Sequence, residues 1–153
     1  RGAEDAGHEV FRFDTAFREV HPCIGCDRCR REGVCTFAAD DMKRLNPHLL
    51  AAEAVVFVSP IYYFDLSAQL KAVIDRFYAN DDALHGGKRA LLLTAMADED
   101  LGAAEGADAT FRSICAYLQW ENAGILNAAG ASTAEDLTEE DLRRAYDLGK
   151  DLK

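Results

Sequence analysis

Short, almost wholly apolar segments alternate with amphipathic ones along this chain, and few folds are compatible with such an alternation. The apolar runs are Val10 to Phe13, Ala54 to Ser59, Ala90 to Ala95 and, more weakly, Ile125 to Ala129. Runs of this kind are typical of strands in a parallel sheet, because helices cover both faces of such a sheet. The pattern therefore predicts an α/β fold with four visible strands.

The segments between these runs have the periodicity of helices that pack on a sheet. We expect Asp65 to cap one helix and Thr138 with Asp141 to form a capping box before the last one. Between Asp40 and Glu53, the pair Asn46-Pro47 predicts a helix that is interrupted and restarted. The expected inner faces contain Leu66, Leu70, Val73, Ile74 and Phe77 in one helix, and Phe111, Ile114, Cys115 and Leu118 in another.

The size and charge of the chain limit its partners. At 153 residues and 49% hydrophobic composition, the chain suffices for one domain, and it contains no linker or repeat. A net charge of -10 would repel nucleic-acid phosphates and anionic lipid. No segment is apolar for long enough to span a bilayer, and the first residues lack the pattern of a secretion signal. We expect no nucleic acid and no membrane as partner, and a cytoplasmic protein.

Three consecutive aromatic residues, Tyr62 to Phe64, follow the strand expected at Ala54 to Ser59. Open α/β sheets bind ligands at the carboxyl ends of their strands, so this segment lies where a ligand site is expected. Pro60 stiffens the turn, Ser59 and the backbone amides offer donors, and the rings suit a flat aromatic ligand such as a flavin. Rings that simply plug the end of the core are the alternative, and it stays open.

Four of the five cysteines lie within thirteen residues, as Cys23, Cys26, Cys29 and Cys35. Thiolates at three-residue steps can surround one face of an iron-sulfur cluster, whereas structural zinc more often uses two separated pairs of ligands. The spacing therefore favours a cluster over zinc, and a reduced loop without metal, or with one disulfide, is the remaining alternative. Cys115 lies on an apolar helix face and is expected in the core.

No other group of residues has the spacing of a catalytic site. The sequence contains no Ser-His-Asp arrangement, no zincin motif and no glycine-rich dinucleotide fingerprint. The histidines have no paired spacing, so we expect no side chain to act as a catalytic acid or base. These histidines are His8, His21, His48 and His85.

Together these residues resemble the flavodoxin-like NAD(P)H-dependent FMN reductases and, more narrowly, the iron-sulfur flavoproteins. The resemblance covers nearly the whole chain. It rests on Pro22-Cys23-Ile24-Gly25-Cys26 with the later cysteines, Asp40-Asp41-Met42, Ser59-Pro60-Ile61-Tyr62-Tyr63, Ser67-Ala68-Gln69-Leu70-Lys71 and Asp75-Arg76-Phe77. It implies a flavodoxin-like three-layer sandwich whose parallel sheet has the strand order 2-1-3-4-5.

The resemblance also implies which residues hold cofactors. In this family the loop after the strand at Ala54 to Ser59 contacts the isoalloxazine ring of FMN, and the loop Thr94 to Ala97 would form a second edge of the site. The implied FMN-binding residues are Ser59, Pro60, Ile61, Tyr62, Tyr63, Phe64, Thr94, Ala95 and Met96. In the iron-sulfur flavoproteins the compact cysteine motif holds a [4Fe-4S] cluster, which implies Cys23, Cys26, Cys29 and Cys35 as ligands here. Many relatives keep only part of that set and bind flavin alone.

The chain departs from the family at its start. Family members begin with a central strand and a Ser/Thr-rich loop for the FMN phosphate, and neither precedes Arg1. Gly2 to Ala6 has the character of a helix end that Gly7 terminates. We therefore expect residues 1-153 to form a single flavodoxin-like FMN-binding domain that is truncated at its N-terminus, with the first strand missing.

The expected function is an FMN-dependent oxidoreductase. It would take electrons from NAD(P)H or a small redox carrier and pass them on through FMN, and a [4Fe-4S] cluster would add one-electron steps. The resemblance further implies a homodimer or a larger homo-oligomer. The alternative from another class is a non-enzymatic electron carrier, or a cysteine-loop metal-binding module, on the same fold.

Overall fold

A sheet of four strands in the order β2-β1-β3-β4 lies at the centre of the computed structural model, which describes residues 1–152. β1 (Ala54–Tyr62), β3 (Arg89–Ala95) and β4 (Glu121–Ala128) run parallel, whereas β2 (Asp65–Leu66) is antiparallel to the end of β1. The parallel strands confirm the predicted α/β fold. The order β1-β3-β4 corresponds to the 3-4-5 part of the expected strand order.

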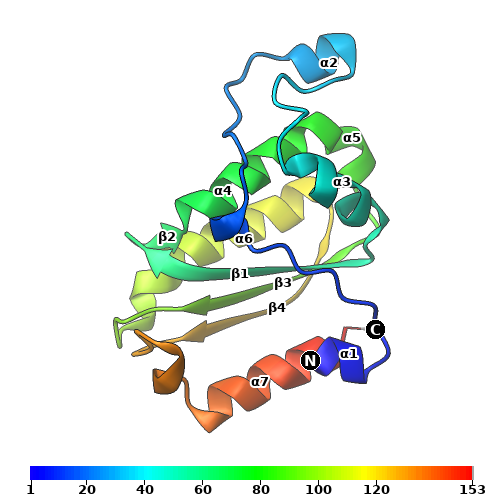
Figure 1. The fold of residues 1–153 in the computed structure, drawn as a ribbon. Coiled ribbons are helices and arrows are strands. Elements are labelled where there is room, and N and C mark those ends of the chain that lie inside the picture. The colour runs from blue at the N-terminus through cyan, green and yellow to red at the C-terminus, as the bar shows by residue number, and fades with distance from the viewer. Residues whose placement is uncertain (153) are drawn as a thin grey trace.

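Helices lie on both sides of the sheet, which gives the three layers of the expected sandwich (Figure 1). The helices on one side are α3 (Met42–Ala51), α4 (Ala68–Asp75), α5 (Asp81–Leu84) and α6 (Glu105–Leu118). Those on the other side are α7 (Glu139–Lys150) and α1 (Gly2–Asp5). The short α2 (Arg28–Glu32) lies beyond α3 and α5, on their side away from the sheet (Figure 1). Single 3-10 turns, η1 to η4, occupy Thr15–Phe17, Arg76–Asn80, Leu101–Ala104 and Ala134–Asp136.

The main core lies between the sheet and α4 and α6. The ring of Phe57 on β1 lies 6.4 Å from that of Phe77 and 5.9 Å from that of Phe111, measured between centroids. Cys115 is buried, as its place on the apolar face of a helix predicted, and burial raises the pKa of its thiol. The other predicted inner-face residues are also in this core, with Ile114 partly buried at its margin.

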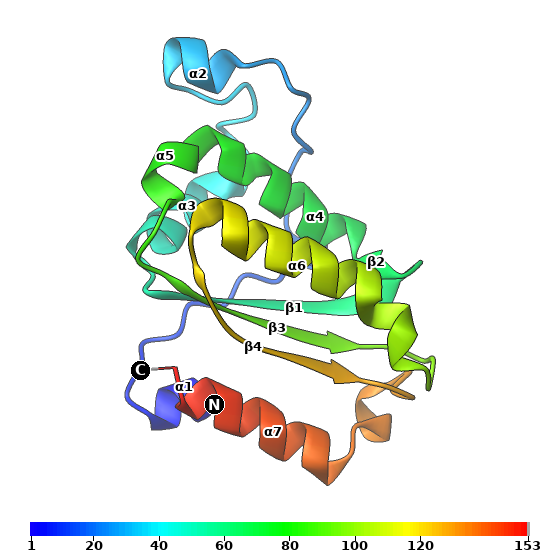
Figure 2. The same cartoon turned by 180° about the vertical axis from the view of Figure 1, so that it is seen from behind.

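The opposite face of the sheet is covered only in part. α7 packs against β4 (Figure 2), and along β1 the burial alternates. Phe57 and Ser59 are buried, while Val56 and Val58 are 42% and 67% exposed. The expectation that β1 would be covered on both faces is therefore wrong for the described part of the chain, although its side chains are apolar on both faces.

The segment Val10 to Phe13 is extended, but it is not a strand. A strand requires a hydrogen-bonded neighbour, and this segment pairs with none within residues 1–152. Val10 and Phe11 are 51% and 45% exposed. On its side away from β3, β1 pairs only through Ile61 and Tyr62, so residues 54–60 of that edge also lack a strand partner in the region described.

Two predicted helix boundaries are wrong. α3 continues through Pro47, although proline lacks the N–H that would bond to the carbonyl of Lys43, four residues earlier. The N-cap of α4 is Ser67, whose Oγ accepts a hydrogen bond from the backbone N of Leu70 at 3.4 Å. Asp65 lies instead in β2, where it belongs to a hairpin that the sequence did not indicate. The capping box of Thr138 and Asp141 is confirmed at the start of α7.

α1 packs closely on α7. A Cβ at Gly2 would collide with the backbone carbonyl oxygen of Tyr146, so glycine permits the two helices to approach. The hydroxyl of Tyr146 donates a hydrogen bond to the carboxylate of Asp5 at 2.9 Å. Among residues 1–152, none of the helices combines the length and the apolar character that crossing a bilayer requires.

Candidate functional site

The aromatic turn, formed by Tyr62, Tyr63 and Phe64, joins β1 to β2. Tyr63 and Phe64 are the two central residues of the hairpin and have φ values of 48° and 69°. Hairpins of this kind usually have Asn or Gly there, because larger side chains are strained at positive φ. Tyr63 is 99% exposed, and the other two side chains are about two-thirds exposed. The three rings therefore lie outside the core, which argues against rings that plug its end.

Buried polar contacts fix the aromatic turn from below. The Oγ of Ser59 accepts a hydrogen bond from the backbone N of Ser67 at 2.9 Å and donates one to the carbonyl of Pro60 at 2.8 Å. Ser59 is buried, so its hydroxyl is committed to holding the turn. Gly106 lies against the carbonyl of Phe64, at a place where a Cβ would collide. The backbone of the turn is thus held in place while its rings point outward.

The carboxyl end of β3 lies beside that of β1, where the aromatic turn begins. Ser59 and Pro60 are in register with Thr94 and Ala95 on the neighbouring strand. The side chains of Thr94 and Met96 are buried, so this edge presents mainly backbone. The residues predicted to bind FMN therefore gather at the carboxyl ends of β1 and β3.

Sequence reasoning missed a polar chain at this edge. The hydroxyl of Thr94 donates to Oδ1 of Asn127 on β4 at 2.6 Å, and Nδ2 of Asn127 donates to Asp108 on α6 at 3.1 Å. Only the register of β3 with β4 brings Thr94 and Asn127 together. The sequence contains one signal for this contact, because a polar residue interrupts each apolar run near its end: Thr94 in the first run and Asn127 in the second.

The cysteine loop, residues 21–40, extends away from the sheet on the side that α4 and α6 cover (Figure 1). It lies near the C-terminal end of α4, whereas the aromatic turn lies near the N-terminal end of that helix. Its four cysteines are unpaired; Cys23 and Cys26 are exposed, and Cys29 and Cys35 are partly exposed. The Sγ of Cys26 lies 3.3 Å from Oγ1 of Thr36, and this hydrogen bond is the main reason why the pKa of the Cys26 thiol is lowered. Within residues 1–152, no three Cys, His, Asp or Glu side chains are placed to hold a metal ion.

One buried guanidinium, that of Arg76, holds both ends of the cysteine loop. Its Nη1 donates to the carbonyl of His21 at 2.8 Å and to Oδ2 of Asp40 at 2.6 Å, and its Nη2 donates to the carbonyl of Phe37 at 3.1 Å. The side chains of Arg76 and Asp40 are each 3% exposed. Burial opposes ionisation of Asp40, but hydrogen bonds from Arg76 and from the backbone N of His21 and Met42 outweigh it and lower the pKa of Asp40.

The outer part of the loop is attached to η2 and α5. The guanidinium of Arg30 pairs with Asp81 at 2.9 Å and with Asp82 at 3.0 Å, and it lies over the ring of Tyr78. The hydroxyl of Tyr78 donates to Asp27 at 2.8 Å. Contacts at the base and near α2 therefore fix the loop, while Cys23 and Cys26 between them are accessible.

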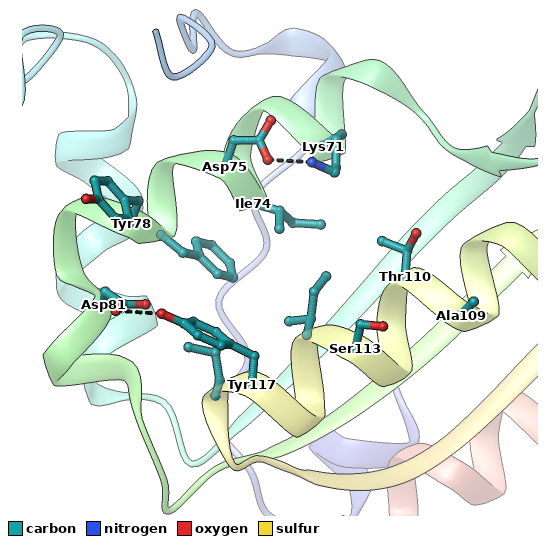
Figure 3. A pocket seen from close by; sticks show the side chains of 12 residues that line it. Lys71, Ile74, Asp75, Tyr78, Asp81, Ala109, Thr110, Ser113 and Tyr117 are labelled. Atoms are coloured by element: carbon teal, nitrogen blue, oxygen red, sulfur yellow. Dashed lines mark hydrogen bonds and ion pairs between the residues drawn. The ribbon is translucent and has the colours of Figure 1, made fainter. Parts of the chain in front are cut away.

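A groove of about 650 Å³ lies between α4 and α6 (Figure 3). Ile74, Ile114 and Tyr117 contribute apolar surface to it, and the pair of Lys71 with Asp75, 2.5 Å apart, lies at its margin. The groove runs along the helices rather than at the carboxyl ends of the strands. It is therefore separate from the edge where the predicted FMN-binding residues gather.

Comparison with known proteins identifies relatives in two groups. The family model of NADPH-dependent FMN reductases matches residues 1–126. An iron-sulfur flavoprotein of Archaeoglobus fulgidus is 34% identical over 85 residues, which cover 54% of this chain and 38% of the relative. An FMN-dependent NADH:quinone oxidoreductase of Methylorubrum extorquens is 31% identical over 126 residues, which cover 72% of this chain and 62% of the relative. The match thus spans less than two thirds of either relative.

Solved structures share the flavodoxin-like fold. An azoreductase from Bacillus anthracis has a TM-score of 0.66 at 19% identity, with 97% of this chain and 86% of that one covered. A flavone reductase has a TM-score of 0.67 at 15% identity, with 99% of this chain and 53% of that one covered. The fold agrees with the family model, which matches most of the sequence. The chain belongs to the NADPH-dependent FMN reductase family.

Proposed function

We propose that residues 1–153 form an FMN-binding domain of an oxidoreductase that takes electrons from NAD(P)H. The observation that carries this proposal is the aromatic turn, because it presents three exposed rings at the carboxyl end of β1 in a chain of the FMN reductase family. Bound FMN would supply the redox chemistry, accepting electrons in pairs and releasing them singly or in pairs. The protein would position the ring, and no side chain is assigned as an acid or a base.

The strain of the aromatic turn supports a role in binding. A left-handed conformation costs a bulky residue about 1–2 kcal/mol, and Tyr63 and Phe64 both adopt it. The ring of Tyr63 is 99% exposed, so it makes no packing contact that would offset this cost. Strained residues of this kind often occur at functional sites, where the surrounding structure holds them for a ligand.

Each part of the proposed site has a distinct role. The rings of the aromatic turn would lie against the flavin, with Pro60 and Ile61 continuing the same surface. Ser59 would act indirectly by holding the turn, since its hydroxyl is already bonded to Ser67 and Pro60. The second edge, Thr94, Ala95 and Met96, would contribute backbone groups.

The variant Tyr63→Gly tests this site. Glycine accommodates the positive φ without strain, so we expect the free energy of unfolding to stay the same or to rise by about 1 kcal/mol. Loss of the ring should weaken FMN binding about tenfold, since an aromatic pair contributes about 0.5–1.5 kcal/mol beyond the area that it buries. Titration of flavin fluorescence measures the Kd, and the thermal midpoint reports stability. Tyr63→Phe keeps the ring and should bind like the parent; unchanged affinity in Tyr63→Gly would remove the turn from the site.

A non-enzymatic electron carrier is the second candidate, and the exposed cysteine loop favours it enough to be tested. NADPH added without oxygen should bleach the bound flavin if the domain is a reductase. A flavin that dithionite reduces rapidly and NADPH does not would identify a carrier instead. Colourless protein with bound zinc would indicate a metal-binding module.

We also propose that Cys23, Cys26, Cys29 and Cys35 hold a [4Fe-4S] cluster. All four thiols are unpaired, and both ends of their loop are held by Arg76. Gly25 and Gly33 have φ values of 64° and 72°, which permit the sharp turns that ligation requires. Relatives named iron-sulfur flavoproteins match this chain. The thiols would have to draw together on binding, and the cluster would add one-electron steps.

Protein purified without oxygen should then be brown. Iron and acid-labile sulfide should be present in equal amounts and approach about four of each per chain. Cys35→Ser should lower both sharply and leave FMN affinity unchanged. Cys115→Ser, which alters the buried cysteine outside the loop, is the matched control and should change neither. Flavin without iron or sulfide, even after chemical reconstitution, would leave an FMN reductase with a metal-free loop.

We further propose a homodimer or larger homo-oligomer that forms over the groove between α4 and α6. Tyr117 is 61% exposed beside it, and Ile74 and Ile114 give the groove apolar surface that a second copy would cover. Light scattering after size exclusion measures the assembly. Ile114→Asp should yield a monomer, and a parent that is monomeric at high concentration would contradict the proposal.

A further inference from the structure

The N-terminal half of α6 is bonded to both edges of the proposed flavin site, which are the aromatic turn and the carboxyl end of β3. The contacts come from Gly106, Asp108 and Thr110, at alternate positions of the helix. Residues four apart lie on one face of a helix, whereas the residue midway between them faces elsewhere. One face of α6 can therefore hold the aromatic turn while another holds the end of β3.

Gly106 and Thr110 hold the aromatic turn. The carbonyl oxygen of Phe64 lies so close to Gly106 that a Cβ there would collide with it. The hydroxyl of Thr110 donates a hydrogen bond to Oδ2 of Asp65 at 3.3 Å, and Oδ1 of Asp65 accepts one from the backbone N of Leu66 at 2.7 Å. The last residue of the turn and the residue that follows it are thus both fixed against α6.

Asp108 holds the end of β3 through Asn127 on β4. Its Oδ1 accepts a hydrogen bond from Nδ2 of Asn127 at 3.1 Å, and its Oδ2 pairs with Arg112 at 3.2 Å. Because an ionised carboxylate only accepts hydrogen bonds, Asp108 decides which end of the Asn127 amide faces α6. The amide oxygen then faces Thr94 and accepts a hydrogen bond from its hydroxyl at 2.6 Å.

These bonds give precision more than stability. Thr94 is 5% exposed and the side chain of Asp108 is 16% exposed, so placing polar groups here has a desolvation cost that apolar side chains would avoid. A satisfied network of hydrogen bonds, however, permits one geometry and makes the structure around it rigid. A binding site benefits from such rigidity, because a ligand that has to order its own site loses affinity.

We propose that Asp108 and Thr110 are positioning residues for FMN. Thr110 acts through Asp65 on the aromatic turn, and Asp108 acts through Asn127 on the end of β3. Because both bonds start from one helix, they fix the two edges relative to each other, and neither side chain has to touch the flavin. This assignment rests on the FMN site proposed above.

Titration of flavin fluorescence with variants of α6 tests the assignment. Asp108→Leu removes the acceptor for Asn127 and should raise the Kd for FMN about tenfold, as the loss of one hydrogen bond to a charged group does. Thr110→Val removes the donor to Asp65 and should raise it about threefold, because that bond is longer. Asp108→Asn and Thr110→Ser keep an acceptor and a donor, and should restore most of the affinity.

Ser113→Ala is the matched control. Ser113 is exposed on the same helix and lines the same groove as Thr110 (Figure 3), so its variant reports any effect of the groove itself. The Kd should stay at the parent value. Visible circular dichroism at saturating FMN reports how the groups around the flavin are arranged. Asp108→Leu and Thr110→Val should change this spectrum, whereas the two conservative variants should keep it.

Several results would overturn the proposal. Unchanged FMN affinity and spectrum in Asp108→Leu and Thr110→Val, with a lower thermal midpoint, would mean that α6 only supports the fold. Equal weakening in Asp108→Asn would exclude the bond to Asn127 as the cause, and equal weakening in Ser113→Ala would assign the effect to the groove. A parent chain that does not bind FMN would refute the proposed function as well. Thr110 is only partly buried, so its variants decide the question even if Asp108→Leu does not fold.

Discussion

Among individual residues, Asp40 has the clearest dependence on pH. Its carboxylate receives hydrogen bonds from Arg76 and from two backbone amides, and these outweigh burial and lower its pKa in the folded protein. A group with a depressed folded pKa contributes stability that is present above its unfolded pKa, about 3.9, and is lost as the pH falls through the folded value. We therefore expect the free energy of unfolding to decrease as the pH falls below about 4.

The variant Asp40→Asn should destabilise the protein by about 3 kcal/mol near neutral pH, because Arg76 then stays buried without a counter-charge. It should also flatten the acid limb of the stability profile, which urea unfolding at a series of pH values measures. Asp14→Asn, which removes the exposed partner of Arg12, is the control and should cost little. An acid limb as steep as that of the parent would assign the pH dependence to other carboxylates.

For single residues, the sequence predicted position better than conformation or pairing. The place of the aromatic residues after a buried run correctly predicted that they would lie at the sheet edge. Their conformation could not be predicted, because local preferences place Asn or Gly in such a turn. The pairing of Asp40 with Arg76 was also hidden, since both residues were noted in motifs but 36 positions separate them.

At the level of elements, periodicity predicts a segment well when the structure of that segment depends on its own residues alone, as that of a helix largely does. Apolar spacing predicted the inner faces of α4 and α6, although it placed Leu66 and Phe77 in the first of these helices and they lie in β2 and η2. Val10 to Phe13 has the composition of a strand, but a strand also depends on a neighbour, and the described chain provides none. The two-residue β2 is too short for any periodic pattern, so the hairpin that shapes the aromatic turn was missed.

The contact of α1 with α7 gives a prediction at this scale. Gly2→Ala places a Cβ against the carbonyl of Tyr146, so α1 should detach or shift at a cost of about 1–3 kcal/mol. The thermal midpoint measures this loss, and limited proteolysis near residue 6 detects the detached helix. Gly102→Ala is the matched control, because its Cβ would meet only the side chain of Asp100. Equal effects of the two substitutions would mean that helix docking contributes nothing specific.

For the whole molecule, the net charge of -10 predicts how salt affects stability. Repulsion among the excess carboxylates destabilises the folded state, and salt screens it. Raising the ionic strength from 0.01 M to 0.1 M shortens the screening length from about 30 Å to about 10 Å. The thermal midpoint, followed by the fluorescence of the buried Trp120, should therefore rise by about a few degrees. A midpoint that falls with salt would show that surface ion pairs outweigh the repulsion.

The docking of α1 on α7 also has a consequence for synthesis. The bond between Tyr146 and Asp5 joins residues 141 positions apart. At about 5–20 residues per second, roughly 7 to 30 seconds of translation separate the two helices. A helix as short as α1 is not stable alone during that interval. While β4 has left the ribosome and α7 has not, the nascent chain therefore exposes an unfolded α1 and an uncovered face of β4 to chaperones. When α7 leaves the ribosome, it packs against both α1 and β4.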